Sequence, residues 1–211
     1  MSKIIVFGAG GRSGRAAVGE AVHRGHHVTA VVRNPAKYQD LEGAGVRVLA
    51  GDVTDSDAVA RLAAGHDAAI TAAYDPGAQP DVFFPAVARA LLDGLARAGV
   101  GRLVVVGLAA TLETGDGTPL MDTPDFPQEY RPLCLAQATG TSVLRASVAA
   151  LDWLVVSPAG DFDHAGASSS RYSVAGVNMA SRISHSDFAL ALLDEIDAPR
   201  NHRTHIGVEG A

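Results

Sequence analysis

Three glycines stand three residues apart behind a short apolar run: Gly8, Gly11 and Gly14 in the stretch VFGAGGRSGR, residues 6–15. Gly8 allows a tight turn, Gly11 lets an anionic group approach the backbone because no Cβ is in the way, and Gly14 lets a following helix pack closely. A helix that begins here offers free N–H groups and the positive end of its dipole to a phosphate. The strict dinucleotide fingerprint G-x-G-x-x-G would need a glycine where Ser13 stands. The pattern therefore predicts a phosphate-binding loop of shifted spacing, and a glycine-rich turn without a ligand is the alternative.

Charged residues follow the next two apolar runs. Arg33 stands where NAD-preferring proteins carry a carboxylate for the ribose 2′-hydroxyl, and a guanidinium there suits a 2′-phosphate. Arg12, inside the glycine loop, adds a second positive contact. We therefore expect NADP(H) in preference to NAD(H), with a solvated surface arginine as the alternative for Arg33. Asp52 is placed to accept a hydrogen bond from the adenine amino group, with Val53 beside the ring, and its alternative is a helix-capping carboxylate.

Candidate proton donors are few. The chain has two lysines, Lys3 and Lys37, and both precede the third apolar run. A tyrosine–lysine pair, in which the lysine lowers the pKa of a tyrosine that protonates an alkoxide, needs a lysine much further along the chain and is excluded. The donors that remain are Thr111, Tyr130 and His164. Each has a structural alternative. The hydroxyl of Thr111 could bond to the backbone, Tyr130 could be a packing residue at a helix start, and His164 could be a polar residue that faces water in a flexible loop.

The order of apolar runs predicts how these residues are positioned. Short β-branched runs predict strands at 3–8, 27–33, 46–52, 67–73, 102–107 and 151–158. Helical patterns fall at 13–24, 54–65, 81–98, 128–149 and 185–197. Strands that alternate with helices form right-handed parallel units, so we expect an α/β, Rossmann-like three-layer sandwich with a mostly parallel sheet. The less regular segments at about 108–130 and 159–182 follow strand carboxyl ends, where ligands bind, and are expected to form a small substrate-pocket region.

Length and composition fit a single domain over residues 1–211, because 47% of the residues are hydrophobic and 19% are charged. The net charge of −6 and the lack of a basic patch argue against a nucleic-acid partner. One cysteine, Cys134, excludes an internal disulfide and indicates a reducing compartment, so we expect a cytoplasmic protein. No apolar stretch reaches the roughly 18 residues of a membrane span, and the N-terminal run is too short for a targeting peptide. Three histidines at 23–27 are joined by no carboxylate or cysteine, so we expect no metal site.

Several stretches together resemble one family. They are IIVFGAGGRSGR, VTAVVRNP, VRVLAGDVTD, RLVVVG, LDWLVVSPAGDF and ISHSDFALALLDEID. In this order they resemble the atypical short-chain dehydrogenase/reductases, and among these the NmrA-like NAD(P)H-binding group near biliverdin-IXβ/flavin reductase. The resemblance implies a Rossmann fold and cofactor contacts from the glycine loop and from the ends of the strands. These contacts are Gly8, Gly11, Arg12, Ser13, Gly14, Arg33, Asp52, Val53, Ala72, Ala73, Tyr74, Gly107, Pro158 and Ala159.

The stretch after the fifth strand departs from the family pattern. Close relatives often have VGGAGSL where this chain has VGLAATL at 106–112, so Leu108 and Ala110 replace glycines and Thr111 replaces a serine. The bulkier residues narrow the expected nicotinamide pocket. The residues expected to contact a substrate are Leu108, Phe126, Asp161 and Phe162.

Three functions fit these residues. The first is an NADP(H)-dependent oxidoreductase that reduces a flat, conjugated small molecule, such as a flavin, quinone, bilin or enone, whose proton can come from water. The second is a redox-sensing regulator that binds NADP(H) without turnover, which the absence of a tyrosine–lysine pair favours. The third is an isomerase or epimerase that uses an aspartate–histidine pair in the 159–182 segment. A monomer or a homodimer is expected in each case.

Overall fold

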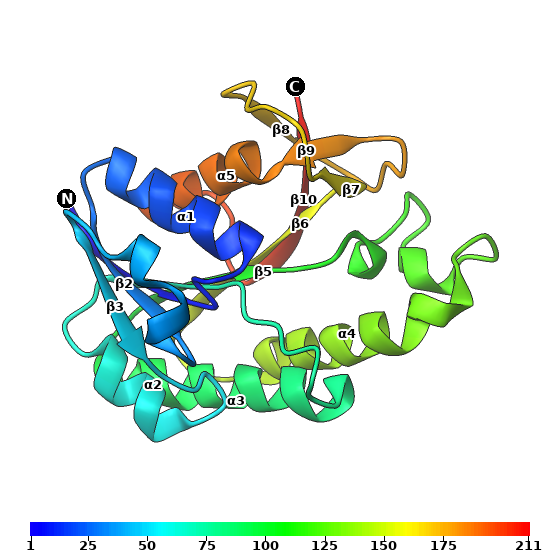
Figure 1. Ribbon diagram of the computed structural model, residues 1–211. Coiled ribbons are helices and arrows are strands. Elements are labelled where there is room, and N and C mark those ends of the chain that lie inside the picture. Colours follow the sequence, from blue (N-terminus) through cyan, green and yellow to red (C-terminus); the bar gives the residue numbers. More distant parts are fainter.

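The computed structural model describes residues 1–211 and is built on one eight-stranded sheet (Figure 1). In spatial order the strands are β3 (Val46–Ala50), β2 (His27–Val32), β1 (Lys3–Phe7), β4 (Ala68–Thr71), β5 (Arg102–Val106), β6 (Asp152–Pro158), β10 (Thr204–Gly210) and β8 (Tyr172–Ala175). Neighbouring strands are parallel except for β8, which runs antiparallel to β10. A separate parallel pair is formed by β7 (Asp161–Asp163) and β9 (Arg182–Ser184). The order of the first six strands is the doubly wound order of dinucleotide-binding folds.

Helices cover both faces of the sheet. Figure 1 shows α1 (Arg12–His23) and α5 (His185–Asp197) on one face, and α2 (Ser56–Ala63), α3 (Pro80–Ala98) and α4 (Arg131–Ala146) on the other. The predicted α/β, Rossmann-like three-layer architecture with a mostly parallel sheet is thereby confirmed. No helix is both long enough and apolar enough to cross a membrane.

The alternation of side chains along each strand divides the core into two layers. In β1, Ile4 and Val6 pack with α1 and α5, whereas Ile5 and Phe7 pack with the helices of the opposite face, and all four are fully buried. A strand buried on both faces reads as a continuous apolar run, which is why β1 was predictable from composition alone. Trp153 of β6 is also buried, with 1% of its surface exposed.

Each predicted strand and helix occurs, but the C-terminal third contains strands that the sequence pattern did not predict. These are β7 and β8, in the segment expected to be irregular, and then β9 and β10. β10 contains Gly207 and Gly210, and a Cβ at either would lie within 2.9 Å of backbone oxygens of neighbouring segments: 2.5 Å from the oxygen of Ala175 and 2.8 Å from that of Arg182. Glycine is required by these close approaches, and it removes the β-branched signature by which strands are recognised.

The helix predicted at 128–149 is shorter than expected. Residues Gln128–Tyr130 form a 3₁₀ turn, and α4 begins at Arg131 with Pro132 in its first turn. Proline lacks an N–H and fits the first turn of a helix but not its interior, which explains the late start. At the other end, the carbonyl oxygens of Ser147 and Ala149 accept hydrogen bonds from Arg203 outside the helix.

Candidate functional site

A cleft of about 1190 Å³ lies over the carboxyl ends of β1 and its neighbours. The strand order reverses at β1, which pairs with β2 on one side and β4 on the other, and open α/β sheets bind ligands at such a point. The predicted cofactor residues that line this cleft are Gly8, Gly11, Arg12, Ser13, Arg33, Asp52, Val53, Ala72, Ala73 and Tyr74. The structure thus brings together, in one cavity, residues from four successive strand ends.

The remaining predicted cofactor residues do not line the cleft. Gly107 donates a backbone hydrogen bond to Val156, 2.7 Å from nitrogen to oxygen, and Ala159 does the same to Val208 at 2.7 Å. Pro158 is the last residue of β6, and Gly14 lies beneath the glycine loop. Gly107, Pro158 and Ala159 therefore continue the hydrogen bonding of the sheet, and Gly14 lets the first helix pack against the loop.

The three glycines of the loop differ in what a side chain would meet. Gly8 has φ +75°, a left-handed conformation that favours glycine. A Cβ on Gly14 would lie 2.2 Å from the carbonyl oxygen of Gly8, whereas a Cβ on Gly11 would meet nothing closer than 3.6 Å. Gly11 is the N-cap of α1, and no side chain caps this helix end and no acidic residue stands in its first turn. The open N-terminus and the free space beside Gly11 fit a phosphate group.

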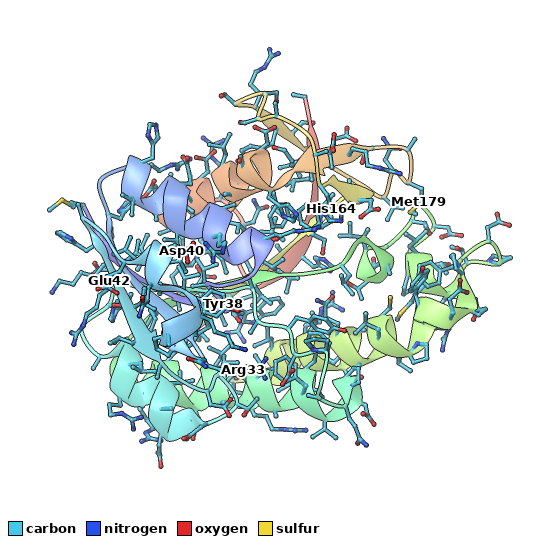
Figure 2. All side chains as sticks on the ribbon, in the orientation of Figure 1. Arg33, Tyr38, Asp40, Glu42, His164 and Met179 are labelled. Atoms are coloured by element: carbon cyan, nitrogen blue, oxygen red, sulfur yellow. The ribbon has the colours of Figure 1, made fainter.

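Basic side chains gather at the end of β2. Arg33 and Lys37 line the cleft, and Arg33 forms an ion pair with Asp75, in the segment that follows β4. A hydrogen bond from the Gly77 N–H and the ion pair with Arg33 lower the pKa of Asp75, so its carboxylate stays ionised. Figure 2 labels Arg33 and Tyr38, which both line the cleft beyond the end of β2. The guanidinium of Arg33 is therefore held at the cleft, where a 2′-phosphate would share it with Asp75.

Asp52 is not the cap of α2. Asp55 has that role, because its Oδ1 accepts from the N–H groups of Asp57 and Ala58 at 2.9 and 3.2 Å. The Oδ1 of Asp52 accepts from the N–H and the hydroxyl of Thr54, at 2.8 and 2.7 Å. The second oxygen of Asp52 makes no hydrogen bond within the chain. That oxygen is a free acceptor in the cleft.

A small apolar recess lies between α3 and α4 at the inner end of the cleft, and shares Ala73 and Val106 with it. Its volume is about 40 Å³, enough for a water molecule or a methyl group. Gln137 of α4 points into it: the Nε2 donates to the carbonyl oxygen of Val106 at 3.5 Å, and the buried Oε1 has no partner. One polar acceptor thus faces an otherwise mostly apolar space beside the end of β5.

Comparison with known proteins identifies the family. The chain matches the model of a family described as NAD(P)H-binding over residues 8–199. The chain belongs to this NAD(P)H-binding family. It is 36% identical over 207 residues to the uncharacterized protein YwnB of Bacillus subtilis, and the match covers 94% of each chain.

Solved structures agree with this identification. A candidate NADH-flavin reductase from Streptococcus pneumoniae is 33% identical, with a TM-score of 0.83 and 100% of each chain covered. A candidate epimerase from Bacteroides thetaiotaomicron is 32% identical, with a TM-score of 0.85, over 99% of this chain and 97% of that one. The resemblance to the atypical short-chain dehydrogenase/reductases is thereby confirmed.

No hydrogen bond joins any two of the three predicted proton donors of this NAD(P)H-binding protein. Thr111, in the 3₁₀ turn Ala109–Thr111, donates its hydroxyl to the carbonyl oxygen of Leu108 at 2.9 Å. Tyr130 is 58% exposed just before α4. His164 is exposed after β7, and its Nδ1 lies 3.2 Å from the Nε2 of His185. Their catalytic roles stay predictions.

The predicted substrate residues lie in two clusters of side chains, and none of them lines the cleft. Leu108 and Phe126 pack around a small cluster that contains Cys134, whose burial raises the pKa of its thiol. Phe162 stacks on His185 with ring centroids 4.2 Å apart, and the neighbouring Asp161 is exposed. The first cluster adjoins α4 and the second adjoins α5.

Asp187, in the first turn of α5, anchors the serine segment that follows β7. The carboxylate accepts hydrogen bonds from the hydroxyl of Ser168 at 2.6 Å and from the N–H groups of Ser169 and Ser170, both at 2.9 Å. It also accepts from Ser184, whose Oγ in turn accepts from the Asp187 N–H at 3.0 Å, so the two residues form a capping box at the start of α5. The serines that the same carboxylate anchors were not predicted.

His185 is a further residue that sequence reasoning missed. Its Nδ1 lies 3.1 Å from the hydroxyl oxygen of Ser13 in the phosphate loop. The two residues are 172 positions apart, and only the packing of α5 beside α1 brings them together. No local pattern could have found this contact.

Proposed function

We propose that this protein is an NADP(H)-dependent reductase of a flat, conjugated small molecule, such as a flavin, quinone, bilin or enone. The cleft at β1 carries the proposal, because it combines an open phosphate loop with a basic rim of Arg12, Arg33 and Lys37. The relative named as a candidate NADH-flavin reductase supports this class of acceptor. We infer one nucleotide-binding domain over residues 1–211, acting as a monomer or homodimer in the reducing cytoplasm that a single buried cysteine fits.

The residues of the cleft would divide the binding of the cofactor among them. The glycine loop and the N-terminus of α1 hold the diphosphate, and Arg33 contacts the 2′-phosphate. Asp52 accepts from the adenine amino group beside Val53, and the segment 72–74 runs along the ribose. The predicted contacts from Gly107, Pro158 and Ala159 belong to the nicotinamide end. Bound NADP(H) supplies a hydride.

Positioning, rather than acid–base chemistry, accounts for catalysis in this proposal. Both lysines of the chain lie before the third strand, so a tyrosine–lysine pair in the usual place is absent from the sequence. Flavins and quinones accept hydride readily, so a site that holds donor and acceptor in near-attack geometry is sufficient. The proton comes from water or from Thr111, Tyr130 or His164, with Leu108, Phe126, Asp161 and Phe162 around the acceptor.

The test is the oxidation of NADPH, followed by its absorbance, with FMN and with simple quinones as acceptors. Turnover supports the proposal. Tight binding of NADPH without turnover on any acceptor would instead favour a redox-sensing regulator. Conversion of a nucleotide-linked substrate without net oxidation would favour the isomerase or epimerase, which the 32% identical candidate epimerase keeps as an alternative.

Arg33→Asp tests the preference for NADP(H). Loss of a charge-assisted hydrogen bond is worth about 1.5–3 kcal/mol, so we expect the Kd for NADPH to rise about 10- to 100-fold while that for NADH changes little. Arg47→Asp makes the same charge change on β3, at an exposed position outside the cleft, and is the matched control. An unchanged ratio of the two Kd values in Arg33→Asp would refute the assignment of NADP(H).

A further inference from the structure

Three aromatic rings are stacked beside the N-terminal end of α1. The ring centroid of His185 lies 4.2 Å from that of Phe162 and 5.4 Å from that of His164, and the centroids of Phe162 and His164 lie 6.4 Å apart, so the three near-parallel rings form a triangle. Phe188 packs against the edge of Phe162 at 5.0 Å. Figure 2 shows His164 close to the end of α1 that faces the cleft. The stack brings the two imidazoles next to each other.

Hydrogen bonds connect this stack to the phosphate loop. The Nδ1 of His164 lies 3.2 Å from the Nε2 of His185, and the Nδ1 of His185 lies 3.1 Å from the Oγ of Ser13. When both rings are neutral, a proton on the Nδ1 of His164 leaves the Nε2 of His185 as acceptor and its Nδ1 as donor. His185 then donates to Ser13, and the hydroxyl proton of Ser13 is free to point into the cleft that Ser13 lines.

The charges around the pair disfavour a proton in the free protein. Burial, the neighbouring His164 and the guanidinium of Arg12 on α1 all lower the pKa of His185. On its own helix, Asp187 is occupied by serine donors, and no carboxylate hydrogen-bonds or ion-pairs with either histidine. On β7, the carboxylate of Asp161 accepts from the Phe162 N–H at 2.7 Å and that of Asp163 from the Ala165 N–H at 3.0 Å, so Arg12 is the charged group that acts on His185.

We propose that the His164–His185 pair takes up a proton from solvent when the diphosphate of the cofactor binds at Ser13. A phosphate oxygen that accepted from the Ser13 hydroxyl would be within about 6 Å of the His185 ring, close enough for an opposite charge to favour the imidazolium. Protonated His185 keeps its donor bond to Ser13, and the exposed His164 exchanges the proton with water. His185 is thus a positioning residue of the diphosphate site, and this proposal rests on the proposed binding of a nicotinamide cofactor.

Calorimetry of NADH binding at one pH, in buffers of different ionisation enthalpy, counts the protons taken up. NADH is the probe because it lacks the 2′-phosphate, which itself titrates near pH 6. We expect the unmodified protein to take up protons as it binds NADH, up to one per NADH bound. The Kd for NADH should rise with pH, by up to about tenfold per unit in the range where the pair titrates.

His185→Gln separates proton uptake from a structural role, because glutamine can hydrogen-bond to Ser13 but does not titrate. We expect NADH to bind with proton uptake abolished and a flat pH profile. Ser13→Ala, which removes the link but no ring from the stack, should reduce the uptake in the same way. His23→Gln, at the opposite, exposed end of α1, is the control and should keep the uptake of the unmodified protein.

The outcomes distinguish this proposal from the proposed function. Binding of NADH without proton uptake by the unmodified protein would overturn the role of the histidine pair and leave the reductase proposal intact. Equal uptake in His185→Gln and the unmodified protein would overturn it as well. Failure of both NADH and NADPH to bind would overturn both proposals.

Discussion

Alanine substitutions in the phosphate loop should separate a packing role from a ligand-binding role. Gly14→Ala places a methyl group 2.2 Å from the carbonyl oxygen of Gly8 and 2.9 Å from the Cα of Ala9. Both neighbours are backbone, so no side-chain rotation relieves the clash and α1 must move. Gly11→Ala places the same methyl group 3.6 Å from its nearest neighbour, at φ −75°, which alanine adopts without strain.

The magnitudes follow from these distances. Overpacking lowers the free energy of unfolding by about 3 kcal/mol at the upper end of its usual range, and replacing a helical glycine by alanine raises it by about 1 kcal/mol. Gly14→Ala should therefore lose about 2 kcal/mol of unfolding free energy, or about 4–8 °C in Tm for a chain of this length. Gly11→Ala should change Tm by less than about 2 °C, because the loss of a good N-cap and the gain from a stiffer unfolded chain nearly cancel. Its methyl group nevertheless occupies the space for a phosphate, so we expect the Kd for NADPH to rise at least tenfold, about 1.4 kcal/mol.

Differential scanning fluorimetry and a binding titration with NADPH measure the two quantities on the same samples. Arg12 and Ser13 are left unchanged in both variants, so the charge of the loop is constant. The reverse pattern, a large fall in Tm for Gly11→Ala with a small one for Gly14→Ala, would refute the assignment of roles. So would unchanged affinity for NADPH in Gly11→Ala.

Three further predictions concern the rest of the chain. Burial lowers the pKa of His205 to about 4, so between about pH 6.5 and pH 4 the unfolded chain binds a proton that the folded chain does not bind. The free energy of unfolding, measured with urea, should therefore fall by about 3 kcal/mol as the pH falls through this range. The variant His205→Gln should not show this fall. Glu195→Ala removes the carboxylate that the buried guanidinium of Arg102 contacts at 2.9 Å, while the ion pair of Arg102 with Asp152 at 2.8 Å remains, and should cost about 1.5–3 kcal/mol in the same assay. Asp187→Ala releases the serine segment after β7, and trypsin should then cleave at the exposed Arg171 about tenfold faster.

Matched observations would contradict each of these. An acid dependence that is the same in His205→Gln would assign the loss to other groups. Asp93→Ala removes an exposed helix carboxylate paired with Arg97 and should cost less than about 1 kcal/mol. An equal cost for Glu195→Ala would show that the buried pair of Glu195 and Arg102 does not stabilise the fold more than an exposed pair. Uniformly faster cleavage in Asp187→Ala, rather than faster cleavage at Arg171, would indicate global unfolding.

The sequence predicted the nucleotide half of the fold because its signals are local. β1, the glycine loop and α1 are continuous in the chain, and each residue's role follows from its place in one turn. Arg33 was predictable for the same reason, since it directly follows a buried strand. Its partner Asp75 was not, because the turn after β4 that carries it across the cleft has no periodic pattern.

The acceptor side of the site was less predictable for a physical reason. Thr111 and Tyr130 lie in 3₁₀ turns, and His164 follows a three-residue strand that pairs only with β9. Where their side chains lie depends on how α4 and α5 are seated on the sheet, and that is decided by packing over the whole core rather than by neighbours in sequence. The contact of Ser13 with His185 has the same origin, since it joins the first turns of α1 and α5. The residues of a phosphate loop are continuous in the chain, so their pattern can be recognised in the sequence. The groups that would move a proton belong to elements that meet only after folding, so no local pattern predicts their arrangement.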